Sequence, residues 1–189
     1  MLGPKPLFML MDGHALVYRA FYGLPPLSVQ RTGEPTGAVL GFTMALLKAL
    51  RDHNPTHCAI VFDRPSPTFR HLKFEKYKAN RPATPDDFRI QLRRVRELVA
   101  AFGIPVYEMD GYEADDLLGT FAKQASEQGI DTVILTGDLD ITQLVTPKVK
   151  VIIPTKSRTG SESITYDEDK VLERFGVKPA ELPDWKGLA

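Results

Sequence analysis

The chain alternates between short apolar runs and longer segments of helical periodicity, and this alternation constrains the fold more than any other feature. The runs are PLFMLMD (6–12), HCAIVFD (57–63), IPVYEMD (104–110), DTVILTGD (131–138) and KVKVIIP (148–154). They are nearly continuous, which is typical of strands covered on both faces of a parallel sheet. Helical patterns lie between them at about 37–51, 85–102 and 113–129, and a shorter one ends at Gly176. We therefore predict a one-domain α/β fold with a mostly parallel central sheet flanked by helices.

Acidic residues close four of these runs or follow directly after them. In open α/β sheets the carboxyl ends of the strands meet at one edge, which is where ligands bind. A single acid at a strand end is usually a turn or cap residue, but independent capping is a poor account of acids on four separate strands. The candidate ligands are Asp12, Asp63, Glu113, Asp115, Asp116, Asp138 and Asp140.

The stretch GYEADDLLGTFA (111–122) places three carboxylates within four positions. A helix dipole favours each acid in a first turn by only about 0.3–1 kcal/mol, in competition with their mutual repulsion. A divalent cation removes that conflict, and helix capping is the alternative explanation. Hard cations such as Mg²⁺ and Mn²⁺ take oxygen ligands. The four histidines are scattered and Cys58 is the single cysteine, which argues against zinc. Seven acids exceed the needs of one Mg²⁺, so the count fits two ions.

A basic segment precedes the acids in the sequence. The formal net charge of the chain is zero, yet residues 64–96 hold ten Lys or Arg against three Asp or Glu. We call residues 64–85 the basic segment; it is rich in proline and long for a connection within a compact domain. Aromatic residues alternate with basic ones in FRHLKFEKYKANR (69–81), which suits phosphates and unpaired bases. The alternative is a solvated loop with inward-packed rings. The basic candidates are Arg70, Lys73, Lys76, Lys78 and Arg81, and the aromatic ones are Phe69, Phe74 and Tyr77.

The cysteine content and the N-terminal run bear on the cellular compartment. One cysteine excludes an internal disulfide, and the run around Cys58 predicts that this thiol is buried. The apolar run at 7–11 is too short for a signal peptide or a membrane span. We expect a cytoplasmic protein that has no membrane partner.

Four motifs occur together and in order: LMDGHALVYRAFYGL, VFDRPSPTFRHLKFEKYKANRPATPDDFRIQL, GYEADDLLGTFA and ILTGDLDITQLV. From about Leu7 to the last residue, the chain closely resembles the 5′-nuclease (5′–3′ exonuclease) domains of the flap endonuclease family, such as that of bacterial DNA polymerase I. The resemblance implies a PIN-like fold and a Mg²⁺-dependent hydrolase. Its substrates would be 5′ flaps, nicked 5′ ends and RNA primers on DNA, in replication and repair.

The resemblance also implies roles for individual residues. Asp138 and Asp140 match the second metal group. Arg19, Arg70, Lys78 and Arg81 match basic positions at the scissile region. Tyr77 matches an aromatic residue of the helical arch through which the 5′ strand passes, and the basic segment would form much of that arch. The implied mechanism is in-line attack by a metal-activated water, with Arg70 and Lys78 neutralising the developing charge. The first metal group is matched by Asp12, Asp63, Glu113, Asp115 and Asp116.

Two departures from the family pattern qualify the resemblance. Relatives commonly have Lys at the position of Leu139. In the family, two further aspartates in a Gly-Asp-x-Ser-Asp-Asn segment and a helix–hairpin–helix region follow the point at which this chain ends. We therefore expect residues 1–189 to be the N-terminal part of a 5′-nuclease domain, with a polymerase domain possible on the same full-length chain. The alternatives are a catalytically incomplete DNA-binding module and a phosphatase or single-strand ribonuclease on a related sheet.

Overall fold

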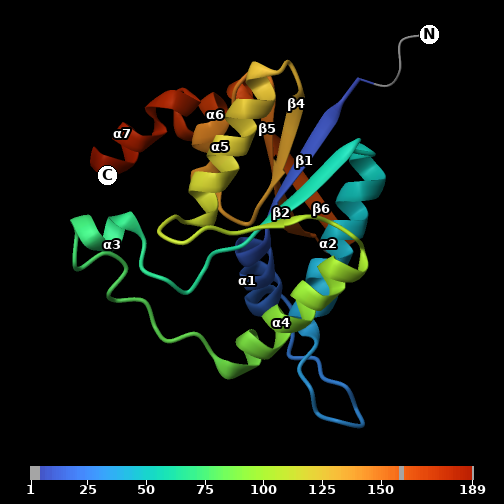
Figure 1. Cartoon of the computed structure of the whole chain (residues 1–189). Coiled ribbons are helices and arrows are strands. Elements are labelled where there is room, and N and C mark those ends of the chain that lie inside the picture. The colour runs from blue at the N-terminus through green and yellow to red at the C-terminus, as the bar shows by residue number, and fades with distance from the viewer. Residues whose placement is uncertain (1–4, 158–159, 189) are drawn as a thin grey trace.

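The computed structural model describes residues 5–157 and 160–188 and has a six-stranded sheet between two helical layers (Figure 1). The strands lie in the order β3-β2-β1-β4-β5-β6. Strands β1 to β5 pair in parallel, and β6 pairs antiparallel to β5 at one edge. This arrangement confirms the predicted mostly parallel sheet and adds β6, which the apolar runs do not predict. The strands are β1 Leu7–Asp12, β2 His57–Val61, β3 Val106–Tyr107, β4 Asp131–Leu135, β5 Val149–Ser157 and β6 Gly160–Tyr166.

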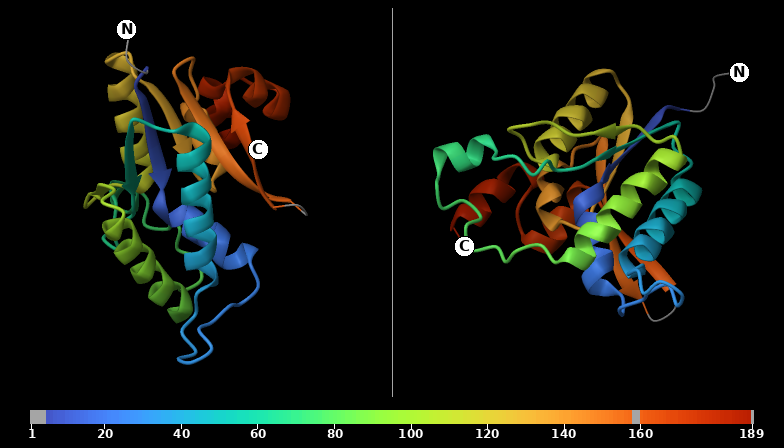
Figure 2. Two further views of the ribbon diagram at one scale, coloured as in Figure 1. Left: turned by 90° about the vertical axis from the view of Figure 1, so that its right-hand side faces the viewer. Right: turned by 60° about the horizontal axis from the view of Figure 1, so that its bottom comes forward.

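The helices cover both faces of the sheet and create two apolar cores (Figure 2). Helices α1, α2 and α4 pack on one face, whereas α5, α6, α7 and the 3₁₀ helix η1 pack on the other. Successive strand residues point to opposite faces, so Met9 and Met11 enter the first core and Leu10 enters the second. The helices are α1 Gly13–Gly23, α2 Gly37–His53, α3 Phe69–Lys73, α4 Asp86–Ala101, α5 Ala114–Glu127, α6 Glu168–Phe175 and α7 Leu182–Leu188, with 3₁₀ helices η1 Leu139–Leu144 and η2 Pro179–Glu181.

The basic segment differs from the helical arch that the resemblance implies. Only α3 is helical, and residues 75–80 form turns before the chain enters α4. The segment leaves the body of the sheet as an open excursion that carries α3 (Figure 1). Prolines at 65, 67, 82 and 85 explain the short helix, because proline lacks a backbone donor and disfavours helical geometry in the residue before it. Lys78 also has a positive φ of 55°, which interrupts any continuous helix.

The start of α1 was not predicted from the sequence, because no loop separates it from β1. Asp12 ends the strand and also caps the helix, and its side chain accepts a hydrogen bond from the Ala15 N–H. Gly13 makes this direct transition possible. A Cβ at this position would lie 2.3 Å from Cε1 of the buried Phe62 ring. The strand end can therefore pack against Phe62 only if residue 13 has no side chain.

Replacing Gly13 with alanine should destabilise the protein by roughly 1–3 kcal/mol, because the buried ring of Phe62 must move to admit the methyl group. The loss would appear as a lower midpoint of thermal unfolding. Gly119→Ala is the matched control within α5, since its Cβ would lie 3.4 Å from the nearest atom of Leu144. The Gly119 variant should be neutral or slightly more stable. Equal midpoints for Gly13→Ala and wild type would contradict this account.

The carboxyl ends of the central strands lie at one edge of the sheet. The chain runs from β1 outward to β2 on one side, and β4 lies on the other side of β1. The carboxyl ends of β1 and β4 therefore form the switch point at which open α/β sheets bind ligands. Within the described ranges, no helix combines the length and the apolar character needed to cross a membrane.

Candidate metal and nucleic-acid site

Five carboxylates gather at the carboxyl edge of the sheet, and we call them the acid cluster. They follow β1, β2 and β4 or lie at the start of α5, and four of them act electrostatically on the fifth, Asp115. This confirms that the strand-end acids share one edge. Two other predicted ligands, Asp116 and Asp140, form ion pairs with Arg70 and Lys186 and are not among these five. The acid cluster consists of Asp12, Asp63, Glu113, Asp115 and Asp138.

Asp12 is the most enclosed member of the acid cluster, with 3% of its surface exposed. Its Oδ1 accepts a hydrogen bond from the Ala15 N–H at 2.9 Å, and its Oδ2 accepts one from the Thr136 hydroxyl at 2.8 Å. Burial raises the pKa of Asp12 to about 6, and Asp63 and Asp138 add to the increase despite these two bonds. The sequence analysis did not select Thr136 as a site residue. Its position just before Gly137 and Asp138 was the signal that could have identified it.

Asp63 links the end of β2 to the start of α5. Its Oδ1 accepts a hydrogen bond from the Ala114 N–H at 2.7 Å, and its own N–H donates to Nδ1 of His14 at 3.0 Å. Nδ1 of His14 is therefore the acceptor, which leaves the ring proton of the neutral imidazole on Nε2. Burial lowers the pKa of His14, which favours this neutral form. His14 is a second residue that sequence reasoning did not select.

Asp115 carries the largest electrostatic cost in the acid cluster. Burial raises its pKa to about 7, and Asp12, Asp138, Asp63 and Glu113 raise it further in that order. Within the described part of the chain, no hydrogen bond or ion pair compensates its carboxylate. A cation placed among these oxygens would relieve both the repulsion and the loss of hydration.

Two cations of the basic segment contact the acids of α5. The guanidinium of Arg70 binds Asp116 through two bonds of 2.7 and 2.8 Å, and this pairing lowers the pKa of Asp116. The Lys78 ammonium lies 2.6 Å from Oε1 of Glu113, and the Tyr77 hydroxyl donates to Oε2 at 3.1 Å. Arg70, Tyr77 and Lys78, which the sequence assigns to nucleic-acid binding, therefore contact the acids at the start of α5.

The remaining predicted residues lie around this centre. Arg19, on α1, is close to Gly137, since a Cβ on that glycine would lie 3.3 Å from Cβ of Arg19. Asp140 forms an ion pair with Lys186 of α7, while Leu139 packs against the second core. Lys186 thus provides a cation where Leu139 replaces the lysine common in the family. Three predicted nucleic-acid contacts are exposed and lie outside the acid cluster: Lys73, Lys76 and Arg81.

The donor set suits a hard divalent cation. All members of the acid cluster offer carboxylate oxygens, which are the ligands that Mg²⁺ and Mn²⁺ prefer. Across residues 5–157 and 160–188, no three side chains of His, Cys, Asp or Glu are already arranged to hold a metal ion. Mutual repulsion separates the acids, and Lys78 and Arg70 draw Glu113 and Asp116 toward the basic segment. The residues present therefore fit the ion chemically, and binding requires these side chains to reorient.

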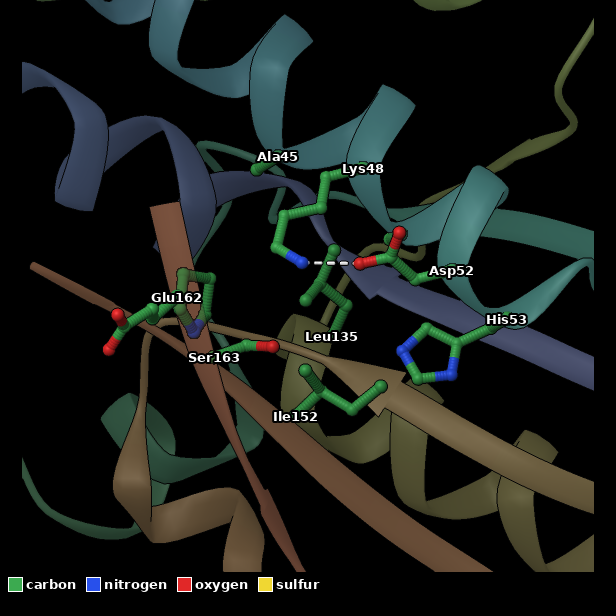
Figure 3. Close-up of a pocket in the computed structure, with 10 residues that line it drawn as sticks. Ala45, Lys48, Asp52, His53, Leu135, Ile152, Glu162 and Ser163 are labelled. Atoms are coloured by element: carbon green, nitrogen blue, oxygen red, sulfur yellow. Dashed lines mark hydrogen bonds and ion pairs between the residues drawn. The ribbon is translucent and has the colours of Figure 1, made fainter. Parts of the chain in front are cut away.

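A small, partly open cavity is lined by residues outside the acid cluster. It has a volume of about 30 Å³ between the end of α2 and strands β5 and β6 (Figure 3). Lys48 and Asp52 form an ion pair at its mouth, and Leu135 and Ile152 line its floor. A space of this size holds one or two water molecules at most. It is therefore too small for a nucleotide.

Comparison with known proteins places the chain among nucleases. The DNA polymerase I of Chloroflexus aurantiacus is 46% identical over 186 residues, which cover 97% of this chain and 20% of that protein. The chain spans about a fifth of the length of the curated relatives it matches.

Two solved structures share the fold. T5 5′-exonuclease with bound divalent zinc ions matches with a TM-score of 0.71 and 19% identity, covering 93% of this chain and 63% of that one. The Holliday junction-resolving enzyme GEN1, in complex with product DNA and a Mg²⁺ ion, matches with a TM-score of 0.52 and 16% identity, covering 94% of this chain and 36% of that one.

A sequence model of a known protein family also matches most of the chain. The model described as 5′-3′ exonuclease, N-terminal resolvase-like domain matches residues 7–176. This range contains the whole acid cluster, Arg70 and Lys78. The chain therefore belongs to the family of 5′–3′ exonuclease N-terminal, resolvase-like domains.

Proposed function

We propose that this chain is the N-terminal part of a divalent-metal-dependent 5′ nuclease. It hydrolyses phosphodiester bonds at 5′ flaps, at nicks and at the 5′ ends of RNA primers on DNA during replication and repair. The observation that carries the proposal is the meeting of the acid cluster with Arg70 and Lys78 at the switch point of the sheet. Family membership and the match to DNA polymerase I support it. A polymerase domain would follow on the full-length chain, and the protein would act in the cytoplasm.

Two Mg²⁺ or Mn²⁺ ions are the proposed cofactors. Asp138 and Asp140 would hold the second ion. Such ions supply charge neutralisation and activate water for attack on a phosphodiester. The oxygen-only donor set supports this choice, as does the Mg²⁺ ion in the GEN1 complex, which shares the fold. The ligands of the first ion would be Asp12, Asp63, Glu113, Asp115 and Asp116.

The basic residues would bind and orient the DNA. Arg70 and Lys78 lie within ion-pair distance of the acids, so they can exchange a carboxylate for a substrate phosphate close to the reacting bond. Arg19 would meet the same phosphate from α1. The exposed Lys73, Lys76 and Arg81 would hold the strand by its phosphates, and the Tyr77 ring would stack on an unpaired base.

A substrate panel on the full-length protein tests this function. A 5′-flap duplex, a blunt duplex, an RNA strand and a small phosphate ester would each be incubated with Mg²⁺, Mn²⁺ or EDTA. We expect cleavage of the flap substrate with either metal and none with EDTA. The variant in which both Asp115 and Asp116 are alanine should not cleave. If that double variant cut the flap as well as wild type, the metal assignment would be wrong.

A catalytically incomplete DNA-binding module is the second candidate. The pairing of Arg70, Lys78 and Lys186 with three predicted ligands favours it, because these acids are already neutralised. This candidate predicts that the full-length protein binds flap DNA at low salt without turnover in Mn²⁺. Turnover of the small ester or of RNA alone would instead indicate a phosphatase or a single-strand ribonuclease.

A further inference from the structure

The geometry points to Thr136 as a positioning residue that fixes Asp12 relative to Asp138 through its hydroxyl group. This inference rests on the proposed function, in which these two acids belong to different metal groups. It assigns Thr136 no contact with substrate or metal. Its effect would pass through the two acids that it holds.

The hydroxyl of Thr136 makes two hydrogen bonds whose directions are fixed. It accepts from the Asp138 N–H at 3.0 Å and donates to Oδ2 of Asp12 at 2.8 Å. An amide N–H can only donate, so the single hydroxyl proton must point to Asp12. Thr136 is fully buried, so water cannot replace either bond. One side chain therefore joins two acids that come from the neighbouring strands β1 and β4.

The surrounding backbone keeps this link rigid. The Thr136 N–H donates to the Ile152 carbonyl at 3.1 Å, which holds the residue against β5. A Cβ on Gly137 would lie 2.8 Å from the Ala15 carbonyl oxygen, so the end of β4 packs directly against α1. Ala15 also donates its N–H to Oδ1 of Asp12. Both carboxylate oxygens of Asp12 are thus oriented, and each retains a free lone pair with which it can bind a cation.

The alternative is that Thr136 only fills space in the buried edge of the sheet. Valine has nearly the same shape as threonine but has no hydroxyl group, so Thr136→Val keeps the packing and removes both hydrogen bonds. Serine keeps the hydroxyl and loses the methyl group. If Thr136 positions the two acids, the Thr136→Ser variant should bind metal and cleave, and the Thr136→Val variant should not. If Thr136 only fills space, the opposite result is expected.

The chain offers a matched control in the same strand. Thr132 is also buried in β4, and its hydroxyl has no hydrogen-bond partner among the described residues. Thr132→Val therefore removes a buried hydroxyl group without breaking a hydrogen bond. It should leave metal binding and cleavage at the wild-type level.

The experiment measures Mn²⁺ affinity by calorimetry and flap cleavage as a function of Mg²⁺ concentration in the full-length protein. Removal of outer hydrogen-bond partners of metal ligands typically costs 10–100-fold in metal affinity or activity. We expect Thr136→Val to weaken Mn²⁺ binding by about 10–100-fold and to shift cleavage to higher Mg²⁺ concentrations. Thr136→Ser should remain close to wild type.

The outcomes separate this inference from the proposed function. If wild type binds Mn²⁺ and cleaves, and Thr136→Val does both equally well, the positioning role is overturned and the function stands. Equal losses in the serine and valine variants would also overturn it, since the methyl group would then be responsible. If wild type itself neither binds Mn²⁺ nor cleaves, the proposed function fails. Should the valine variant not fold, comparison of Thr136→Ala with Thr136→Ser provides the test, because both variants lack the methyl group and differ only in the hydroxyl group.

Discussion

Asp115→Asn in the full-length protein should lower flap cleavage by more than about 100-fold, since loss of an outer partner of a metal ligand alone costs 10–100-fold. Asp115 is surrounded by the other four acids and is the member whose charge they oppose most strongly. An amide has nearly the same shape but removes a full negative charge from the centre that would bind the cations. The expected loss should therefore appear in turnover at every Mg²⁺ concentration that is practical to use.

The control for this variant is Glu127→Gln, at the opposite end of α5. Oε1 of Glu127 lies 4.0 Å from Nζ of Lys123 in an exposed ion pair, and Glu127 is more than ten positions from Asp115 in the sequence. The Glu127→Gln variant should cleave the flap at the wild-type rate. Wild-type cleavage by Asp115→Asn would show that the acid cluster is not a cation site, and helix capping would then account for the acids of α5.

Asp12 and Asp115 should make the metal-free protein less stable as the pH rises from about 4 to about 7, and the lowered pKa of His14 opposes part of this change. Folding raises the pKa of Asp12 to about 6 and that of Asp115 to about 7, both above the ordinary value of 3.8. Between these values the folded state binds more protons than the unfolded state, so deprotonation favours unfolding. Each pKa unit corresponds to about 1.4 kcal/mol. The two shifts overlap, because each of these acids raises the pKa of the other.

Urea unfolding in EDTA at pH 5 and pH 8 would measure this effect. At pH 8, Asp115→Asn should be more stable than wild type by roughly 2–4 kcal/mol, because it lacks the buried charge. The difference should shrink at pH 5, where Asp115 of the wild type is protonated. Saturating Mg²⁺ should stabilise the wild type at pH 8 and should have much less effect on the variant. If Asp115→Asn were less stable than wild type at pH 8 in EDTA, repulsion among the carboxylates would not be what destabilises the metal-free fold at this site.

The expected loss of cleavage and gain of stability in Asp115→Asn have the same physical cause. A carboxylate that attracts a cation must first be held near other carboxylates, and without the cation that arrangement destabilises the fold. Arg70 and Lys78 relieve part of this cost by pairing with Asp116 and Glu113. Asp115 has no such partner among the described residues, so it should show both effects most clearly.

The shape of the basic segment shows where local sequence patterns stop being informative. Its charge fits the observed contacts of Arg70 and Lys78 with the acids of α5, because opposite charges attract whatever the backbone geometry. Its extended shape was not predicted. Four prolines and the positive φ of Lys78 limit the helix to α3, while the bonds from Arg70 and Lys78 fix where the segment lies.

The sequence alone determined the five parallel strands of the sheet, the edge at which the acids gather and the family, whereas β6 came only from the structure. Short continuous apolar runs that alternate with helical patterns are typical of a covered parallel sheet, and the carboxyl ends of its parallel strands lie at one edge. The tertiary structure alone decided which partner each acid has. The bond from Thr136 to Asp12 spans 124 positions, and the cation near Leu139 comes from Lys186 of α7. Such contacts depend on how separate elements pack, and no local periodicity encodes them.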